Sequence, residues 1–161
     1  MTTTPFAGRT AQDVIKALHL QPLEGEGSFW AAGPRTRNLS SITVLLTTGD
    51  EGFSAMHKLE VDEGWQWVEG APAVMLRLGR GGHGALSSIE ARNGQVLVTA
   101  DTWQGAATLG DWTLLTCWCA PAFTWSGFVL ADRDELQHDY PDWSREIEVL
   151  TRVRQSVQRA G

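Results

Sequence analysis

Short apolar segments separated by turns run through most of this sequence and constrain its fold more than any other feature. From about residue 29 to residue 130, valine, isoleucine, leucine, threonine and tryptophan gather in brief runs that glycine-rich turns interrupt. Brief runs with a turn about every 8–12 residues are typical of antiparallel sandwiches and barrels. We predict strands at Phe29–Ala31, Ser41–Thr47, Ser54–Leu59, Gly64–Glu69, Ala73–Leu78, Gly84–Glu90, Gln95–Thr99, Thr102–Thr108, Trp112–Cys119 and Phe123–Leu130. The dipeptide Asn93-Gly94 is typical of a hairpin turn.

The two ends of the chain have helical patterns instead. Thr10 and Asp13 have the spacing of a capping box, which predicts a short helix at about residues 11–18. Asp132–Leu136 has the pattern of one helical turn, and apolar residues at helical spacing predict a terminal helix over Ser144–Gln158. We therefore expect one all-β domain at residues 10–141. Residues 142–161 are expected to form a C-terminal helix that packs on this domain or extends from it.

The charge balance restricts the partners of the protein. Acidic residues outnumber basic ones by 19 to 13, which gives a formal net charge of -6. Non-specific binding to nucleic acids or to anionic membranes needs a basic surface, so both classes of partner are disfavoured. No apolar run reaches the roughly 20 residues of a membrane-spanning helix, and the first residues do not resemble a secretory signal. We expect a cytoplasmic protein whose partner is a small-molecule ligand.

The tryptophans and cysteines of the sequence indicate what the interior of the protein contains. The sequence has eight tryptophans, most of them within apolar segments, which indicates either a large core or an aromatic-lined ligand cavity. Its two cysteines, Cys117 and Cys119, lie on one face of an extended segment, where they are too constrained to bridge each other. One such pair supplies too few ligands for a structural zinc site. We expect two buried free thiols.

His57 and Glu63 are the residues best suited to chemistry. They flank a short turn, so we predict a hairpin that brings the imidazole and the carboxylate together across one sheet. By alternation, Trp65 and Trp67 share the face of Glu63. Burial of such a pair in an indole-lined cavity would shift the pKa values of both groups, which is how enzymes adjust general acids and bases to their task. The alternative is a pair that only satisfies its own polar groups within the core.

The spacing around this pair resembles a known motif. His57, Leu59, Glu63 and Gly70 follow the pattern His-x-Leu-x-x-x-Glu-x-x-x-x-x-x-Gly, which is similar to the first cupin motif, where a second histidine stands in place of the leucine. The second cupin motif, Pro-x-Gly-x-x-His, aligns with Thr99–Gln104. Further blocks match one bacterial and fungal cupin group over about residues 12–141, namely Leu18–Gly25, Trp103-Gln104, Cys117–Phe123 and Phe128–Arg133.

This resemblance implies a fold and a site. The fold would be a cupin double-stranded β-helix, or jelly roll, with a short N-terminal and a C-terminal helix, and related proteins usually form homodimers. The cavity would be lined by His57, Glu63, Trp65, Trp67, Trp103, Gln104 and Cys117. The group is related in shape to deoxysugar epimerases. That likeness suggests a metal-independent isomerase or epimerase, with His57 as the general base, Glu63 orienting it or returning the proton, and Gln104 donating hydrogen bonds to an oxyanion.

Departures from the motifs bear on metal binding. Leu59 replaces one histidine ligand and Gln104 replaces another, so any metal would have only His57, Glu63 and Gln104 as ligands. We therefore expect no cofactor, with a metal-dependent cupin enzyme and a non-catalytic binder of a small polar or aromatic metabolite as alternatives. Pro34-Arg-Thr-Arg37 could contact an anionic group, although two arginines in a loop often have no special role.

Overall fold

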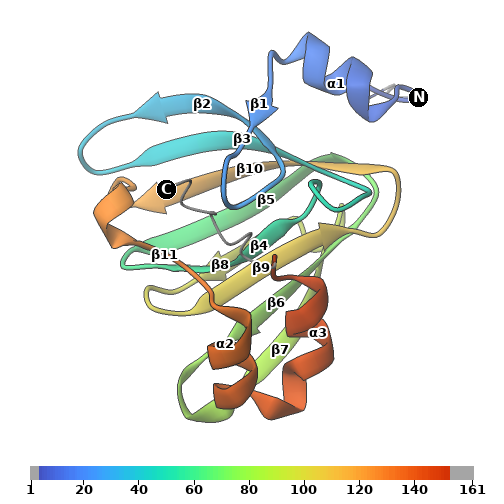
Figure 1. Ribbon diagram of the computed structural model, residues 1–161. Coiled ribbons are helices and arrows are strands. Elements are labelled where there is room, and N and C mark those ends of the chain that lie inside the picture. The colour runs from blue at the N-terminus through green and yellow to red at the C-terminus, as the bar shows by residue number, and fades with distance from the viewer. Residues whose placement is uncertain (1–3, 153–161) are drawn as a thin grey trace, which may run out of the picture.

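Strands β3 to β10 are divided between two antiparallel sheets that pack face to face (Figure 1). The computed structural model describes residues 4–152. One sheet contains, in spatial order, β3 (Ser40–Thr47), β10 (Trp112–Ala120), β5 (Asp62–Gly70) and β8 (Gln95–Val98). The other contains β4 (Ser54–Leu59), β9 (Trp103–Thr108), β6 (Ala73–Leu78) and β7 (Gly84–Ile89). This order is that of a jelly roll, which confirms the fold class predicted from the sequence.

Three further strands extend the two sheets. In the six-stranded sheet, β2 (Phe29–Arg35) pairs with β3, and β1 (Gln21–Pro22) pairs with β2. In the five-stranded sheet, β11 (Phe128–Leu130) pairs with β4. The strand predicted at Phe123–Leu130 is shorter than expected because a 3-10 turn, Trp125–Gly127, occupies its middle. The hairpin predicted at Asn93-Gly94 is wrong, since β7 and β8 lie in different sheets.

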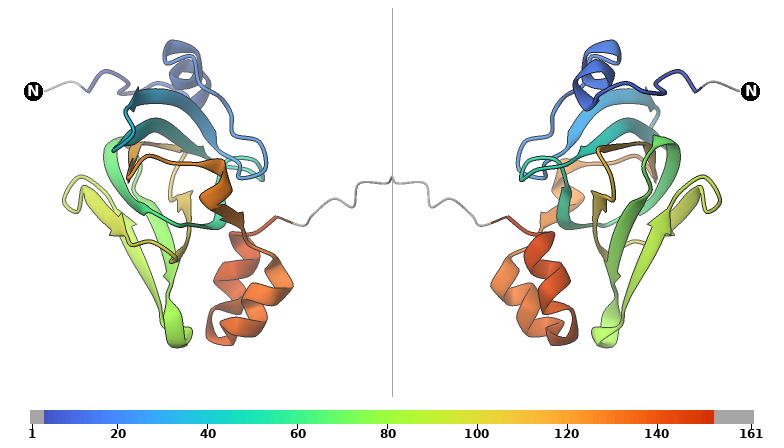
Figure 2. Two further views of the ribbon diagram at one scale, coloured as in Figure 1. Left: turned by 90° about the vertical axis from the view of Figure 1, so that its left-hand side faces the viewer. Right: turned by 90° about the vertical axis from the view of Figure 1, so that its right-hand side faces the viewer.

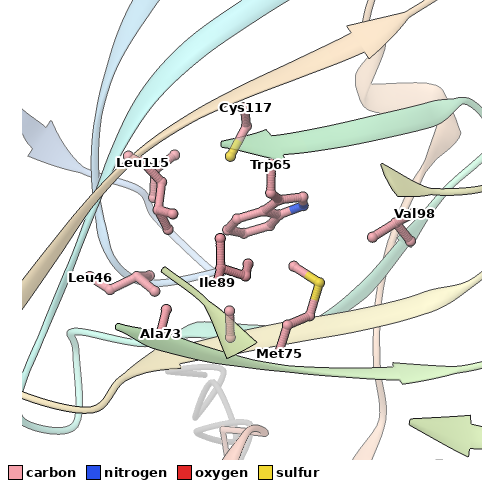
Figure 3. Packing of buried hydrophobic residues seen from close by; sticks show 10 residues of the cluster. Leu46, Trp65, Ala73, Met75, Ile89, Val98, Leu115 and Cys117 are labelled. Carbon is pink, nitrogen blue, oxygen red and sulfur yellow. The ribbon is translucent and has the colours of Figure 1, made fainter. Parts of the chain in front are cut away.

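Alternation along the strands produces the interior core. Val44 and Leu46 of β3 point inward, while Leu45 between them packs on the outer face. Trp65 lies at the centre of the inner cluster, with Cys117 and Leu115 on one side and Ile89 and Met75 on the other (Figure 3). These side chains form the apolar core at one end of the barrel. The other end contains the candidate site.

Helices cover the outer face of each sheet. The helix α1 (Ala11–Ala17) lies over the six-stranded sheet, and Thr10 and Asp13 form the predicted capping box. The helices α2 (Arg133–Asp139) and α3 (Ser144–Val149) pack on the outer face of the five-stranded sheet (Figure 2). Short 3-10 segments occur at η1 (Arg80–Gly82) and η3 (Pro141–Trp143). Among residues 4–152, no helix has the length and apolar character needed to cross a membrane.

The terminal helix is shorter than the sequence pattern predicts. It begins at Ser144 as expected but ends at Val149, and the remainder of the predicted Ser144–Gln158 helix, from residue 153, lies outside the described residues. The backbone N–H of Met56 donates to the carbonyl of Leu150, so the chain leaves the helix where it docks onto β4. Ile147 and Leu150 are buried against the sheet at this point.

Candidate active site

A cavity of about 280 Å³ occupies the end of the barrel that the core leaves open. Most of its wall is aromatic or aliphatic, with Trp30 and Trp65 toward the interior and Phe123, Trp125 and Phe128 beside its mouth. The ring of Phe128 stacks on that of His57 at a centroid distance of 5.4 Å. Trp125 is 65% exposed, so the mouth carries a large indole in contact with solvent. A concave, mainly apolar cavity with a few polar groups is the usual form of a small-molecule site.

Paired residues on the six-stranded sheet form successive inward-facing rows, because directly opposed residues point to the same side. The row nearest the mouth is Glu63, Cys119, Ser40 and Arg35, on β5, β10, β3 and β2. The second row is Trp65, Cys117, Ile42 and Ala32, and the third is Trp67, Leu115, Val44 and Trp30. The first two rows line the cavity in full, whereas the third lines it only at Val44 and Trp30.

His57 reaches the same space from the five-stranded sheet. Its Nε2 lies 3.8 Å from Oε2 of Glu63, and both side chains are buried. The sequence correctly brought these two residues together, but the predicted hairpin within one sheet is wrong. The strands β4 and β5 belong to opposing sheets, so the pair spans the barrel interior. The intervening turn crosses between the sheets, as most connections between successive strands of this jelly roll do.

Gln104 and Trp65 hold Glu63 in place. The indole Nε1 of Trp65 donates to Oε1 of Gln104 at 2.8 Å, and Nε2 of Gln104 donates to Oε2 of Glu63 at 2.7 Å. This chain orients the glutamine amide unambiguously, because an indole only donates and a carboxylate only accepts. Gln104 is opposite His57 in the β4–β9 register and is not among the residues that line the cavity. Its contacts position the carboxylate of Glu63, which differs from the oxyanion contact that the sequence suggested.

Besides Gln104, two predicted cavity residues lie outside the cavity. Trp67 is on the inward face as expected, but its row is filled by core residues, and its Nε1 lies 3.4 Å from the Ala71 carbonyl. Trp103 points to the outer face of β9, where it packs with the cluster beneath α2 and α3. The Nζ of Lys58 lies 4.8 Å from the centroid of the Trp103 ring. Trp65 and Cys117 do line the cavity.

Glu26 is a functional candidate that the sequence reasoning missed. It lies in the turn before β2, with Oε1 3.6 Å from Nδ1 of His57 and accepting a hydrogen bond from the Ser54 hydroxyl at 2.7 Å. Nδ1 of His57 also lies 2.7 Å from the Ala55 carbonyl. The imidazole is therefore held between two carboxylates, one at each ring nitrogen. The sequence marks Glu26 only as part of a glycine-rich turn, since a loop residue has no periodicity that predicts its partner.

The two carboxylates control the charge of His57. Burial alone lowers the pKa of the imidazole, but the negative charges of Glu26 and Glu63 outweigh it and raise the pKa from 6.5 to about 9. Burial raises the pKa of Glu26, and the neighbouring His57 opposes that shift. Burial also raises the pKa of Cys117 and of Cys119, so both free thiols stay protonated at neutral pH. At neutral pH the site contains an imidazolium between carboxylates.

The side chains at this site do not fit a catalytic metal. Leu59 lines the cavity where a second histidine ligand would stand, and Gln104 uses both ends of its amide on Trp65 and Glu63. One ring nitrogen of His57 faces the Ala55 carbonyl. Within residues 4–152, no group of three histidine, cysteine, aspartate or glutamate side chains is arranged to hold an ion. A catalytic metal normally has about three good protein ligands, and these residues do not supply them.

The fold and the open-ended cavity define a double-stranded β-helix protein of the cupin class. Residues 12–131 match one particular family, described as Cupin superfamily (DUF985), and the chain therefore belongs to that family. No curated protein matches this chain significantly.

Solved structures share the fold over most of the chain. Protein SO0799 from Shewanella oneidensis is 28% identical with a TM-score of 0.78, covering 89% of this chain and 98% of its own. A hypothetical protein from Leishmania major is 21% identical with a TM-score of 0.80, covering 90% of this chain and 100% of its own. A Klebsiella pneumoniae protein described by its double-stranded β-helix domain is 18% identical with a TM-score of 0.55, covering 72% and 93%.

The raised pKa of His57 predicts a specific pH dependence of stability. The folded state binds the imidazole proton more tightly than the unfolded state, so this stabilisation is complete below pH 6.5 and is lost as the pH rises toward 9. His57→Gln should lower the unfolding free energy by about 1–2 kcal/mol at the acidic end of this window. The difference in unfolding free energy between wild type and His57→Gln should shrink as the pH rises toward 9.

Urea denaturation across the window measures this difference directly. His138→Gln is the matched control, because His138 is exposed and forms no ion pair within residues 4–152. Parallel stability curves for wild type and His57→Gln would contradict the proposed charge on His57.

Proposed function

We propose that the cavity binds a small metabolite and that His57 and Glu63 transfer protons on it, as in a metal-independent isomerase or epimerase. One observation carries this proposal: an imidazole and a carboxylate from opposing sheets meet 3.8 Å apart at an apolar cavity wall. Titratable pairs in a water-poor cleft are the usual machinery of general acid–base catalysis.

The size of the cavity limits the metabolite. A volume of 280 Å³ corresponds to about nine waters of liquid, or a molecule of roughly ten to fifteen non-hydrogen atoms. A monosaccharide or a single substituted aromatic ring has this size. The nucleotide part of a sugar nucleotide would have to remain outside the mouth.

The electrostatics favour a different division of roles from the one that the sequence suggested. An imidazolium has no free base to offer, so His57 is better suited to act as the acid than as the general base. Within residues 4–152, Oε1 of Glu63 has no hydrogen-bond partner, while Oε2 is held by Gln104. Glu63 lines the cavity and is therefore better placed to accept a proton from a ligand.

The chemistry follows from these positions. The Glu63 carboxylate would take a proton from a carbon next to a carbonyl, while the imidazolium of His57 donates its Nε2 proton to the carbonyl oxygen. The resulting enol is neutral. Return of the proton from Glu63 to the neighbouring carbon, while an enol hydroxyl gives its proton back to Nε2 of His57, completes the isomerisation and restores both groups. The apolar wall excludes water, which would otherwise compete for both groups.

Exchange of substrate hydrogen for solvent deuterium tests this proposal. We expect wild-type protein in D₂O, with a chelator present, to incorporate deuterium into members of a panel of small keto acids and aldoses, as observed by NMR. Glu63→Gln should slow this exchange by about a hundredfold or more, since general base catalysis contributes at least that factor. The matched control is Glu69→Gln, on the same strand: Glu63 and Glu69 are 6% and 5% exposed, but Glu69 is outside the cavity and binds the Phe6 N–H.

Three outcomes would contradict parts of the proposal. Ligands that raise the melting temperature of the wild type without exchanging hydrogen would identify a non-catalytic binding protein. Exchange that the chelator abolishes and a transition metal restores would identify a metal-dependent enzyme. Equal loss of exchange in Glu63→Gln and Glu69→Gln would show that the effect comes from general damage to the core.

We also propose that the protein is a homodimer. The edge strands β7 and β8 carry the exposed side chains of Leu86 and Leu97, which are about half accessible. Uncovered edges with apolar side chains favour pairing with a second copy, usually about a two-fold axis. Light scattering at micromolar concentration should give about twice the 17.6 kDa chain mass, and a monomer would contradict this assembly.

A further inference from the structure

We propose that the cavity is a dipolar site for an elongated ligand, whose carboxylate binds Arg35 at the mouth and whose far end donates a hydrogen bond to Glu63. This inference rests on the proposed function only in taking the cavity as the ligand site. It names the class of ligand and identifies Arg35 as a residue that determines specificity.

Arg35 and Glu63 occupy opposite ends of one inward-facing row. Cross-strand pairing links Arg35 to Ser40, Ser40 to Cys119 and Cys119 to Glu63, and all four residues line the cavity. Three interstrand steps of about 4.8 Å separate the backbones of Arg35 and Glu63 by about 14 Å. The two side chains between them are a hydroxyl and a thiol that stays protonated. The row therefore has a cation at one end and a carboxylate at the other.

The guanidinium of Arg35 is available to a ligand. One terminal nitrogen donates to the Phe123 carbonyl at 2.7 Å, which ties the side chain to the aromatic mouth. Among residues 4–152, no carboxylate lies within 4.0 Å of this guanidinium. An arginine presents five N–H donors, so most remain free to bind a carboxylate, and a planar fork suits that partner better than an ammonium does.

The Glu63 end of this row disfavours an anion. Two carboxylates, Glu26 and Glu63, face the single imidazolium of His57 there. A ligand carboxylate placed beside them would approach two acidic side chains in an apolar environment, where repulsion between like charges is strong. A hydroxyl or an ammonium would instead donate to Oε1 of Glu63, which has no partner within residues 4–152.

The row of residues beneath this polar row favours an apolar spacer in the ligand. Ile42 and Ala32 follow the polar row toward the interior, and Trp30 stands beside them on β2. A flat or aliphatic spacer would pack on these side chains, whereas charges on adjacent carbons could not reach both ends. The ligand class is thus a hydroxy acid or an amino acid whose two polar groups are separated by a ring or a chain of similar length.

Four para-substituted benzene probes test this assignment by calorimetry. 4-(Hydroxymethyl)benzoate and 4-(aminomethyl)benzoate have both polar ends, with a neutral and a cationic donor respectively. 4-Methylbenzyl alcohol lacks the carboxylate, and 4-methylbenzoate lacks the donor. We expect wild type to bind the two complete probes about tenfold to a hundredfold more tightly than either partial probe, because each charge-assisted hydrogen bond contributes on this scale. The tighter of the two complete probes then distinguishes the hydroxyl from the ammonium.

Two neighbouring arginines supply the variant and its control. Arg35→Gln should lose the preference for 4-(hydroxymethyl)benzoate over 4-methylbenzyl alcohol, while Arg35→Lys keeps part of it. Arg37→Gln should keep the full preference, because Arg37 is exposed in the same turn but does not line the cavity. The glutamine amide can still donate to Phe123, so the mouth should keep its shape in Arg35→Gln.

The failures of the two proposals can be told apart. Equal binding of the acid and the alcohol by wild type, or a full preference for the acid in Arg35→Gln, would overturn the dipolar site and leave the proton-transfer proposal standing. If no probe binds at millimolar concentration, the dipolar site is overturned as well. The deuterium exchange of the wild type then decides separately whether the cavity holds any substrate.

Discussion

A chain of buried polar contacts joins the two sheets beside the cavity, and the organisation of the site depends on it. From the six-stranded sheet, Trp65 donates to Gln104 on the opposing sheet, and Gln104 donates back to Glu63. His57 lies against Glu63 and, through its other nitrogen, against Glu26. Each member is buried or nearly so, and an unpaired charge in such a place would be costly. The charges of the site therefore persist only because they satisfy one another.

The same interior serves two purposes at its two ends. At the filled end, Leu46, Met75, Ile89 and Leu115 are fully buried and supply the stability that burial of apolar surface provides. At the open end, the cavity takes the place of the apolar core, and Glu26, His57 and Glu63 line it. Trp65 belongs to both parts, since it is the centre of the apolar cluster and also fixes Gln104 and, through it, Glu63. Damage to the core near Trp65 would therefore disturb the site as well.

The sequence predicts the strands well because alternation along a half-buried strand is a local property. Which sheet a strand joins, how deep a residue lies in the barrel and which side chain it contacts all depend on distant parts of the chain. The errors in the sequence predictions are of these kinds. His57 and Glu63 fit a hairpin as well as a crossing between sheets, and only the jelly-roll topology distinguishes the two. Trp67 is on the predicted face, but it stands at the end of its row that the core fills, outside the cavity. Glu26 sits in a loop without periodicity, so nothing in the sequence pattern connects it to His57.

The protonation state of His57 tests this account most directly. NMR titration of the ¹⁵N-labelled imidazole, with exposed His19, His83 and His138 as internal references, reports its charge and pKa. The account predicts an imidazolium at neutral pH with a pKa near 9, and a lower pKa in both Glu26→Gln and Glu63→Gln. A neutral ring with a pKa at or below 6.5 in the wild type would contradict it.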